Sequence, residues 1–234
     1  MALETYGQEV ADHLSDPETH RTWSLAAQDG IISTAGILLG FSGAGVGPST
    51  MLVAGTAAIV AGMLTAGGAQ WSETAVQREA ELAAIAVQRH ELKAQPEVQR
   101  AELVAHYEEK GLDAALAAEV ADALMERAPL RAALESEHGI LELTTRAQVL
   151  LSGVGFSLAY GLGAAIPFAI AWYLPVDIEL WVIVFTVLLS LVLTSVLGAR
   201  AGRMDLTRTL VRTLLVATVT IVASYAVGAL GAGG

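Results

Sequence analysis

One carboxylate stands at the edge of a long uncharged stretch of the sequence. Asp29 directly precedes residues 30–72, which contain no Asp, Glu, Lys or Arg. If a membrane helix begins near Trp23, Asp29 lies about 9 Å along it at the usual helical rise. An ionisable group at that depth is costly and marks an ion or proton pathway. We therefore interpret Asp29, with Ser33 one turn later, as part of a pathway that exchanges a proton for a metal ion. The alternative is that Asp29 only caps a helix beginning at Gly30.

Four side chains of the next hydrophobic segment are candidates for the same pathway. The thioether of Met63 is a soft ligand, which suits Fe²⁺ and other transition metals better than Ca²⁺ or Mg²⁺. Gln70 and Glu73 are three residues apart and share one face of a helix. The alternatives are that Met63 only packs and that Glu73 is a solvated residue beyond the membrane. The predicted pathway residues of this segment are Met63, Thr65, Gln70 and Glu73.

A second group of potential metal ligands lies in an acid-rich segment, residues 72–148. Glu91 and Glu102 can approach each other across a turn at Pro96. Glu102 and His106 are four residues apart on one helix, a spacing at which two side chains can share a metal ion. Two carboxylates and an imidazole complete the predicted metal-binding set: Glu135, Glu137 and His138. The alternative is an ordinary acidic helix face in water.

The distribution of charge predicts the elements that position these residues. The chain is 54% hydrophobic and only 16% charged, whereas a soluble domain averages about 25% charged. Its uncharged stretches are long enough for membrane helices, which need about 20 residues each. A glycine-rich segment at 43–49 divides the longest stretch into two. We predict spans over residues 23–42, 50–71, 149–173, 180–199 and 210–230, and hence an integral membrane protein in a lipid bilayer.

The basic residues predict the orientation of these spans. With the N-terminus in the cytoplasm, twelve of the thirteen Lys and Arg residues fall on the cytoplasmic side, and Arg212 lies at the inner end of the last span. This distribution follows the positive-inside rule, and it places the C-terminus outside. The first 20 residues are acidic and resemble no signal peptide. We therefore expect a prokaryotic plasma membrane.

The predicted fold class is all-α: five transmembrane helices with a small cytoplasmic helical bundle between spans two and three. Prolines 96 and 129 and glycines 111 and 139 mark helix ends within the bundle. The predicted domains are an acidic cytoplasmic segment (1–22), spans one and two (23–71), an acidic metal-binding domain (72–148) and spans three to five (149–234). The absence of cysteine excludes disulfides, thiolate metal sites and iron–sulfur clusters. The net charge of −11 argues against a nucleic-acid partner.

Several short runs, taken in order, resemble one known family. Residues 29–34 (DGIIST) with 40–44 (GFSGA) are similar to its first span, and residues 61–68 (AGMLTAGG) with 77–79 (QRE) to its second. Residues 106–112 (HYEEKGL) are similar to its cytoplasmic metal-binding domain. Residues 163–167 (GAAIP) and the run Arg212, Tyr225, Gly228 are similar to its third and fifth spans. Over about residues 20–230 the chain thus resembles the vacuolar iron transporter family.

This resemblance implies a homodimeric antiporter that moves Fe²⁺, often also Mn²⁺, out of the cytosol in exchange for protons. Asp29 corresponds to the family's core membrane aspartate, and Glu91, Glu102 and Glu137 to glutamates of its cytoplasmic metal cluster. The divalent metal is the substrate, and no permanent cofactor is expected. Some positions depart from the family's pattern: Thr22, Ala66, Gln70, Ala105, Ala133 and Leu134.

Two other functions remain open from the residues. A membrane-tethered ferroxidase needs a pair of E-x-x-H motifs and two further glutamates, and this chain has one such motif, Glu135-x-x-His138. A scaffold or metal sensor that keeps the fold but has lost transport is the second alternative. We favour a transporter that is not an enzyme.

Overall fold

The computed structural model describes residues 16–173, 176–201 and 205–232. These residues form eight helices, labelled α2 to α9, and no strand occurs among them. The chain divides into two compact units. We call residues 1–72 with 150–234 the membrane unit, and residues 73–149 the acidic unit. Much of the predicted acidic segment 1–22 lies outside the described residues.

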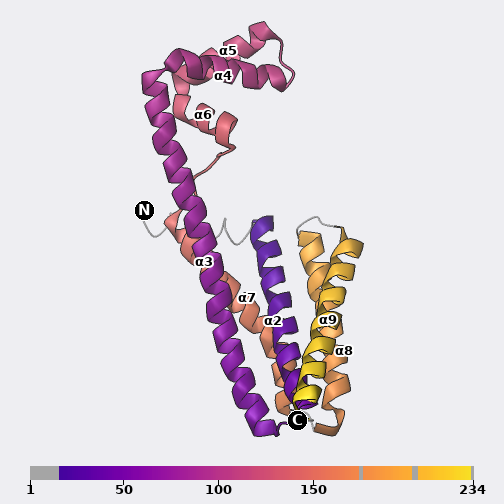
Figure 1. Ribbon diagram of the computed structural model, residues 1–234. Helices are drawn as coiled ribbons and strands as arrows, with labels where there is room; N and C mark the ends of the chain where they lie inside the picture. Colours follow the sequence, from indigo (N-terminus) through magenta and orange to yellow (C-terminus); the bar gives the residue numbers. More distant parts are fainter. Residues whose placement is uncertain (1–15, 174–175, 202–204, 233–234) are drawn as a thin grey trace, which may run out of the picture. The chain divides into compact units, whose positions relative to one another are not determined.

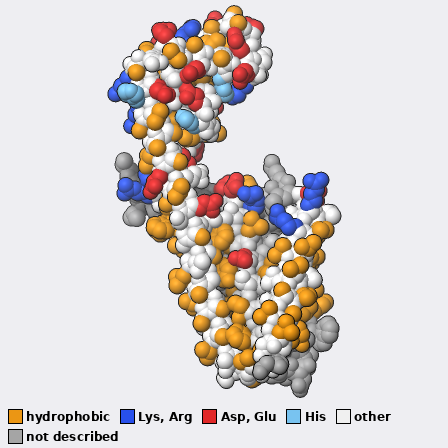
Figure 2. Space-filling view, viewed as in Figure 1, with side chains coloured by type: hydrophobic (Ala, Val, Ile, Leu, Met, Phe, Trp, Pro, Cys, Tyr) orange, Lys and Arg blue, Asp and Glu red, His pale blue; other side chains and the backbone are white. Residues whose placement is uncertain are grey.

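Five helices of the described chain are long and apolar enough to cross a membrane, which confirms the five predicted spans. Each is longer than the hydrophobic segment that predicted it. Their bounds are α2 Pro17–Gly43, α3 Pro48–Ala94, α7 Arg146–Tyr173, α8 Val176–Ala201 and α9 Leu206–Ala232. Figure 1 shows these helices, and Figure 2 shows many hydrophobic side chains on the face of them that is in view. The protein is an integral membrane protein.

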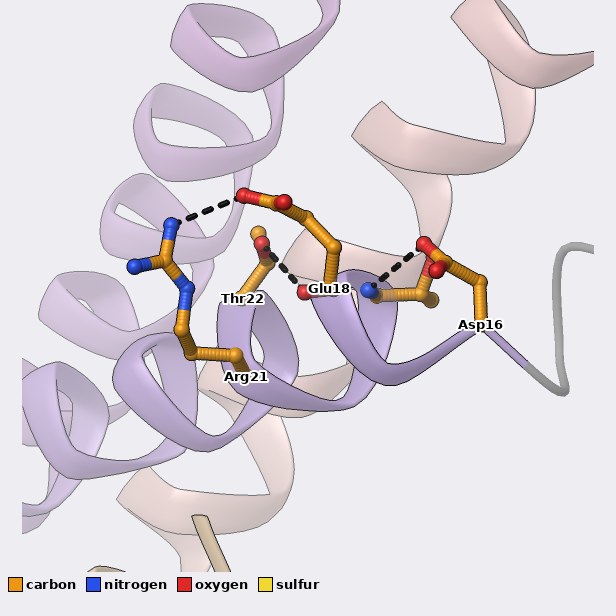
Figure 3. Close-up of polar contacts among 5 residues, drawn as sticks. Asp16, Glu18, Arg21 and Thr22 are labelled. Carbon is orange, nitrogen blue, oxygen red and sulfur yellow. Dashed lines mark hydrogen bonds and ion pairs between the residues drawn. The ribbon is translucent and has the colours of Figure 1, made fainter. Parts of the chain in front are cut away.

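Helix α2 begins twelve residues before Asp29. Asp16 caps it, because its side chain accepts a hydrogen bond of 3.1 Å from the backbone N–H of Thr19. In the first turns Arg21 pairs with Glu18 at 2.8 Å, and the Thr22 hydroxyl donates to the Glu18 carbonyl at 2.9 Å (Figure 3). The alternative that Asp29 caps a helix starting at Gly30 is therefore wrong.

A short turn separates α2 from α3, where the glycine-rich segment predicted a break. Gly45 has a φ of +66°, which an L-residue with a side chain rarely adopts. Helix α3 then starts at Pro48 and continues for 47 residues. It therefore runs from the second predicted span into the acidic segment without interruption.

Helix α2 lies at the centre of the membrane unit. It packs against α8 and α9, and its buried residues Ile31, Leu38 and Leu39 join a hydrophobic cluster with Ile183 and Leu191 of α8. Burial on several sides fixes the rotation of α2 about its axis.

Glycines let the backbones of α7 and α9 approach α2 without intervening side chains. A Cβ on Gly30 of α2 would overlap the Tyr160 carbonyl of α7, and a Cβ on Gly163 of α7 would overlap the Ala27 carbonyl of α2. Gly228 of α9 meets the backbone of Gly40 in the same way. Such small-residue contacts are a common basis of helix packing in membranes. These ones are made within a single chain.

The acidic unit consists of the end of α3 and three short helices. These are α4 Pro96–Glu109, α5 Ala114–Arg127 and α6 Pro129–His138. They pack around buried Leu103, Ala121 and Ala132, one residue from each helix. The small residues at two of these positions let the helices lie close together.

The helix ends in the acidic unit fall where the sequence predicts them. Asp113 caps α5 by accepting hydrogen bonds from the N–H groups of the second and third residues. Gly111 and Gly139 follow α4 and α6 with φ of +98° and +67°. Pro96 and Pro129 stand at the first positions of α4 and α6.

Candidate metal centres

Asp29 lies well inside α2, about 18 Å from the start of the helix at the usual rise per residue. Its carboxylate interacts with the hydroxyl of Ser33, one turn further along the same face. The side chain is exposed on the surface of the protomer, although its neighbours Gln28 and Gly30 are buried. Asp29 and Ser33 therefore form one polar site on an apolar helix, and the site opens outward from the single chain.

The residue before Asp29 forms a buried polar contact that joins three helices. Gln28 of α2 is 6% exposed. Its Nε2 donates to the hydroxyl of Ser195 in α8 at 3.4 Å, and its Oε1 accepts from the hydroxyl of Thr213 in α9 at 3.1 Å. Consecutive helical residues point about 100° apart, since a turn takes 3.6 residues. Gln28 thus faces α8 and α9, while Asp29 is directed to a different side.

Met63 lies against α7 rather than in open space. Its thioether contacts Gly161, and it packs beside the buried Tyr160. The Ser157 hydroxyl of α7 donates to the Met63 carbonyl at 2.8 Å. Tyr160 also meets Gly30 through its carbonyl and Gly62 through its hydroxyl. A single tyrosine therefore contacts both the helix of Asp29 and the helix of Met63.

The other predicted pathway residues follow Met63 along α3. Thr65 and Glu73 are exposed, and Gln70 is half-buried. Gln70 and Glu73 are three residues apart on a continuous helix, as the sequence predicts. Their part in transport remains a prediction.

Two carboxylates of the acidic unit, Glu91 of α3 and Glu137 of α6, lie within electrostatic reach of a third, Glu102 of α4. We call them the carboxylate cluster. Desolvation by the neighbouring protein atoms raises the pKa of Glu102, and the negative charges of Glu137 and Glu91 raise it further. The expected approach of Glu91 and Glu102 across the turn at Pro96 is therefore present. Negative charge concentrated in this way attracts a cation.

Two buried glutamines hold the carboxylate cluster together. Gln88 of α3 is fully buried, and its Nε2 donates to Glu137 at 2.9 Å and also to the Gln99 side-chain carbonyl. Gln99 of α4 is 6% exposed, and its Nε2 donates to Glu102 at 2.8 Å. Hydrogen bonds to ionised groups are stronger than those between neutral groups. The two buried amides thus orient two of the three carboxylates, Glu137 and Glu102, through hydrogen bonds.

The remaining predicted ligands lie toward other parts of the acidic unit. The His106 ring makes an edge contact with Tyr107, with centroids 5.4 Å apart. Glu135 and His138 are exposed near the end of α6. His138 also lines a pocket of about 520 Å³ together with Glu81 and Glu142. Among the described residues, no three His, Asp or Glu side chains are close enough together to hold a metal ion. Metal binding by this set remains a prediction.

Four polar residues that the structure places at these sites were not predicted from the sequence: Gln28, Tyr160, Gln88 and Gln99. A signal for the last two was present, because each glutamine precedes a cluster glutamate by three residues and so shares its helix face. Glutamine next to an intramembrane aspartate was a further signal. The role of Tyr160 depends on contacts between helices distant in sequence, which no local pattern contains.

Comparison with known families supports the resemblance. A model of the VIT family, the vacuolar iron transporter family, matches residues 21–229 of this chain. A search of curated proteins finds no match. The family's members are transporters rather than enzymes. Because the match extends over both the membrane helices and the acidic unit, this chain belongs to the VIT family.

Proposed function

We propose that this protein is a proton-coupled antiporter that exports Fe²⁺, Mn²⁺ or both from the cytosol. The observation that carries the proposal is Asp29, a carboxylate well within the length of the membrane-spanning helix α2. A cation that enters hydrocarbon must replace its hydration shell with protein ligands, and a carboxylate supplies both an oxygen donor and a compensating charge. When the metal leaves, the same carboxylate can take up a proton. One site then serves both ions in turn.

A homodimer explains the exposure of this site. Intramembrane charged side chains almost always face a protein interior or a water-filled cavity, yet Asp29 is exposed on the single protomer. A second copy that covers this side would enclose Asp29 and Ser33 in a pathway between the two chains. We place Met63, Thr65, Gln70 and Glu73 along the same route, because Tyr160 of α7 contacts both α2 and α3.

The acidic unit collects the metal before transport. Its carboxylate cluster is open to solvent, since Glu102 and Glu137 are exposed. We place this unit in the cytoplasm, with the N-terminus inside and the C-terminus outside, because that orientation puts the basic residues on the inner side. Clustered negative charge raises the local concentration of divalent cations. His106, Glu135 and His138 are additional ligands in this proposal.

Transport into proteoliposomes tests the function. Vesicles with an acidic lumen should take up Mn²⁺ and Fe²⁺ through the purified wild-type protein as protons leave. Asp29→Asn should reduce this uptake to background, because asparagine lacks both the charge and the exchangeable proton. Asp16→Asn is the matched control: it makes the same chemical change on the same helix, and asparagine also caps helices well. The control should transport normally. Wild-type rates in Asp29→Asn protein would refute the mechanism.

A further inference from the structure

A buried amide beside Asp29 joins three helices of the membrane unit. Both polar atoms of the Gln28 side chain are paired: Nε2 donates to Ser195 of α8 at 3.4 Å, and Oε1 accepts from Thr213 of α9 at 3.1 Å. Gln28 and Thr213 are 6% exposed, and Ser195 is fully buried. Apolar side chains would fill the same space without the desolvation of an amide and two hydroxyls. The contact therefore supplies something that apolar packing does not.

A second polar contact lies one turn earlier on the same face of α2. The Ser24 hydroxyl donates to the Thr194 carbonyl of α8 at 2.9 Å. A Cβ on Gly198 of α8 would come too close to this hydroxyl, so the glycine leaves room for it. Ser24 and Gln28 are four residues apart and thus lie one above the other on the helix. Two directional contacts in succession therefore join α2 to α8.

Asp29 lies between the Gln28 contact and a tight backbone contact. Successive residues of a helix point about 100° apart, so Gln28 and Gly30 flank Asp29 on its two sides. Gln28 faces α8 and α9, whereas Gly30 meets the Tyr160 carbonyl of α7. Turning α2 by one residue in either direction would bring Asp29 against a packed helix. The outward direction of Asp29 therefore depends on the rotation of α2.

Hydrogen bonds select one rotation of a membrane helix more strongly than apolar contacts do. Lipid chains are as apolar as leucine side chains, so an apolar helix surface gains little from one particular rotation. An amide that loses its partners in an apolar environment is costly. Rotation of α2 away from Ser195 and Thr213 would leave Gln28 in that situation. The Gln28 contact thus fixes how α2 is turned.

We infer that Gln28 is the positioning residue of the transport site. Its amide holds α2 at the rotation in which Asp29 and Ser33 stay together on the outward side of the protomer. Ser33 interacts with Asp29 one turn along the same face, so one rotation sets the direction of both groups. This inference rests on the proposed function, in which Asp29 binds the transported metal. Gln28 acts through Asp29 and does not itself touch the metal.

The apparent KM for Mn²⁺ separates a positioning role from a packing role. A variant that only destabilises the fold lowers the maximal rate, because fewer molecules are active, and leaves KM unchanged. A variant that misdirects Asp29 weakens the binding of the metal and raises KM. Uptake of Mn²⁺ by proteoliposomes with an acidic lumen gives both values, relative to the amount of full-length protein reconstituted.

Gln28→Leu removes the amide and retains an apolar side chain of similar size. It should raise the apparent KM for Mn²⁺ by at least about 10-fold, the lower range for residues that support a metal ligand. Its melting temperature in detergent should change little, because single hydrogen bonds between membrane helices contribute little to stability.

Thr213 provides a matched series, since valine keeps its shape and serine keeps its hydroxyl. Thr213→Val should raise KM as Gln28→Leu does, and Thr213→Ser should retain the wild-type KM. Thr218→Val makes the same change at an exposed threonine of α9 and should leave KM unchanged. If Gln28→Leu does not fold or shows no uptake, the Thr213 series decides the question.

Three results would overturn the inference: a wild-type KM in Gln28→Leu or Thr213→Val, an equal rise in KM for Thr213→Val and Thr213→Ser, or absence of Mn²⁺ uptake by the wild type. Only the last also removes the proposed function. In the other two the wild type still transports Mn²⁺, so the proposed function stands and the role of Gln28 alone is lost.

Discussion

Asp29 and the carboxylate cluster present negative charge in opposite surroundings. Asp29 is a single carboxylate on an apolar helix, with Ser33 as its polar neighbour along the chain. The cluster brings three carboxylates together at the surface of the acidic unit, over two buried amides. Burying a charge in hydrocarbon is expensive, whereas water weakens each surface charge. One carboxylate is therefore effective in the membrane unit, and several must cooperate in the acidic unit.

The two regions also differ in how they are held together. In the membrane unit, glycines bring helix backbones into direct contact, as at Gly30 and Gly163. In the acidic unit, side-chain amides link helices through hydrogen bonds to carboxylates. Backbone contacts have no freedom to rearrange, while an amide can rotate. The membrane site is thus suited to fixed geometry and the cluster to adjustment around a ligand.

The difference between Asp29 and the carboxylate cluster predicts that a substitution at one site leaves the function of the other intact. The largest expected effect is on metal transport. Asp29→Asn should abolish metal uptake by proteoliposomes and leave Mn²⁺ binding to the carboxylate cluster unchanged, because the cluster uses other carboxylates. Uptake and equilibrium binding are measured on the same preparation. Loss of both activities together would show that the two sites are not independent.

The proposed orientation predicts an all-or-none difference in labelling between the two units. Cysteine at Gly47, in the turn between α2 and α3, should react with an impermeant thiol reagent added to intact cells. Cysteine at Lys110, at the end of α4, should react only after the cells are opened. The chain has no native cysteine, which leaves the background low. Labelling of position 110 in intact cells would reverse the orientation.

Removing two cluster carboxylates should weaken binding without abolishing it. Glu91→Ala with Glu102→Ala should lower the Mn²⁺ affinity of the whole protein by at least about 10-fold, the lower range for residues that support a metal site. Glu119→Ala with Glu126→Ala is the matched control, since both glutamates are exposed on α5. Calorimetric titration measures both variants. An equal loss of Mn²⁺ affinity in the two double variants would show that the net negative charge of the acidic unit, and not the carboxylate cluster, attracts the ion.

Backbone contact in the membrane unit predicts a smaller effect on stability. Gly163→Ala should lower the melting temperature, because its Cβ would overlap the Ala27 carbonyl in α2. Gly68→Ala is the control: no atom lies within 4 Å of its added Cβ, and alanine favours a helix over glycine by about 1 kcal/mol. It should leave the melting temperature unchanged or raise it. Thermal unfolding in detergent, followed by fluorescence, tests this pair, and a stabilised Gly163→Ala would contradict it.

The smallest predicted effect is a change in one pKa of the cluster. Because the pKa of Glu102 is raised in the folded protein, its protonated form favours folding at low pH, and this contribution is lost as the pH rises through that pKa. Metal binding must strengthen over the same interval, since the carboxylate then becomes available. Glu137→Gln should lower the pKa of Glu102 but leave it above the ordinary value, because desolvation is the larger cause. The side-chain ¹³C shift of Glu102 against pH measures this, and an unchanged titration would exclude repulsion by Glu137.

Much of the fold was predictable because its signals are local. Charge-free stretches located the five spans, and prolines and glycines marked helix ends in the acidic unit. The sequence predicted the first span from residue 23, whereas α2 begins at Pro17. The first turns of the helix contain the charged residues Glu18 and Arg21, so they lack the pattern of a hydrophobic span. A helix can begin in a polar segment and continue into the membrane.

The sequence by itself determined the helical class, the number of spans and the residue types available for metal chemistry, because hydropathy and helix-end signals act over a few residues. Only the tertiary structure decided that Gln28 joins α2 to Ser195 and Thr213, that Tyr160 connects α2 with α3, and that two buried glutamines support the carboxylate cluster. Each of these contacts joins helices far apart in the chain. Their geometry depends on how whole helices pack, and packing is set by shape and burial over many residues at once.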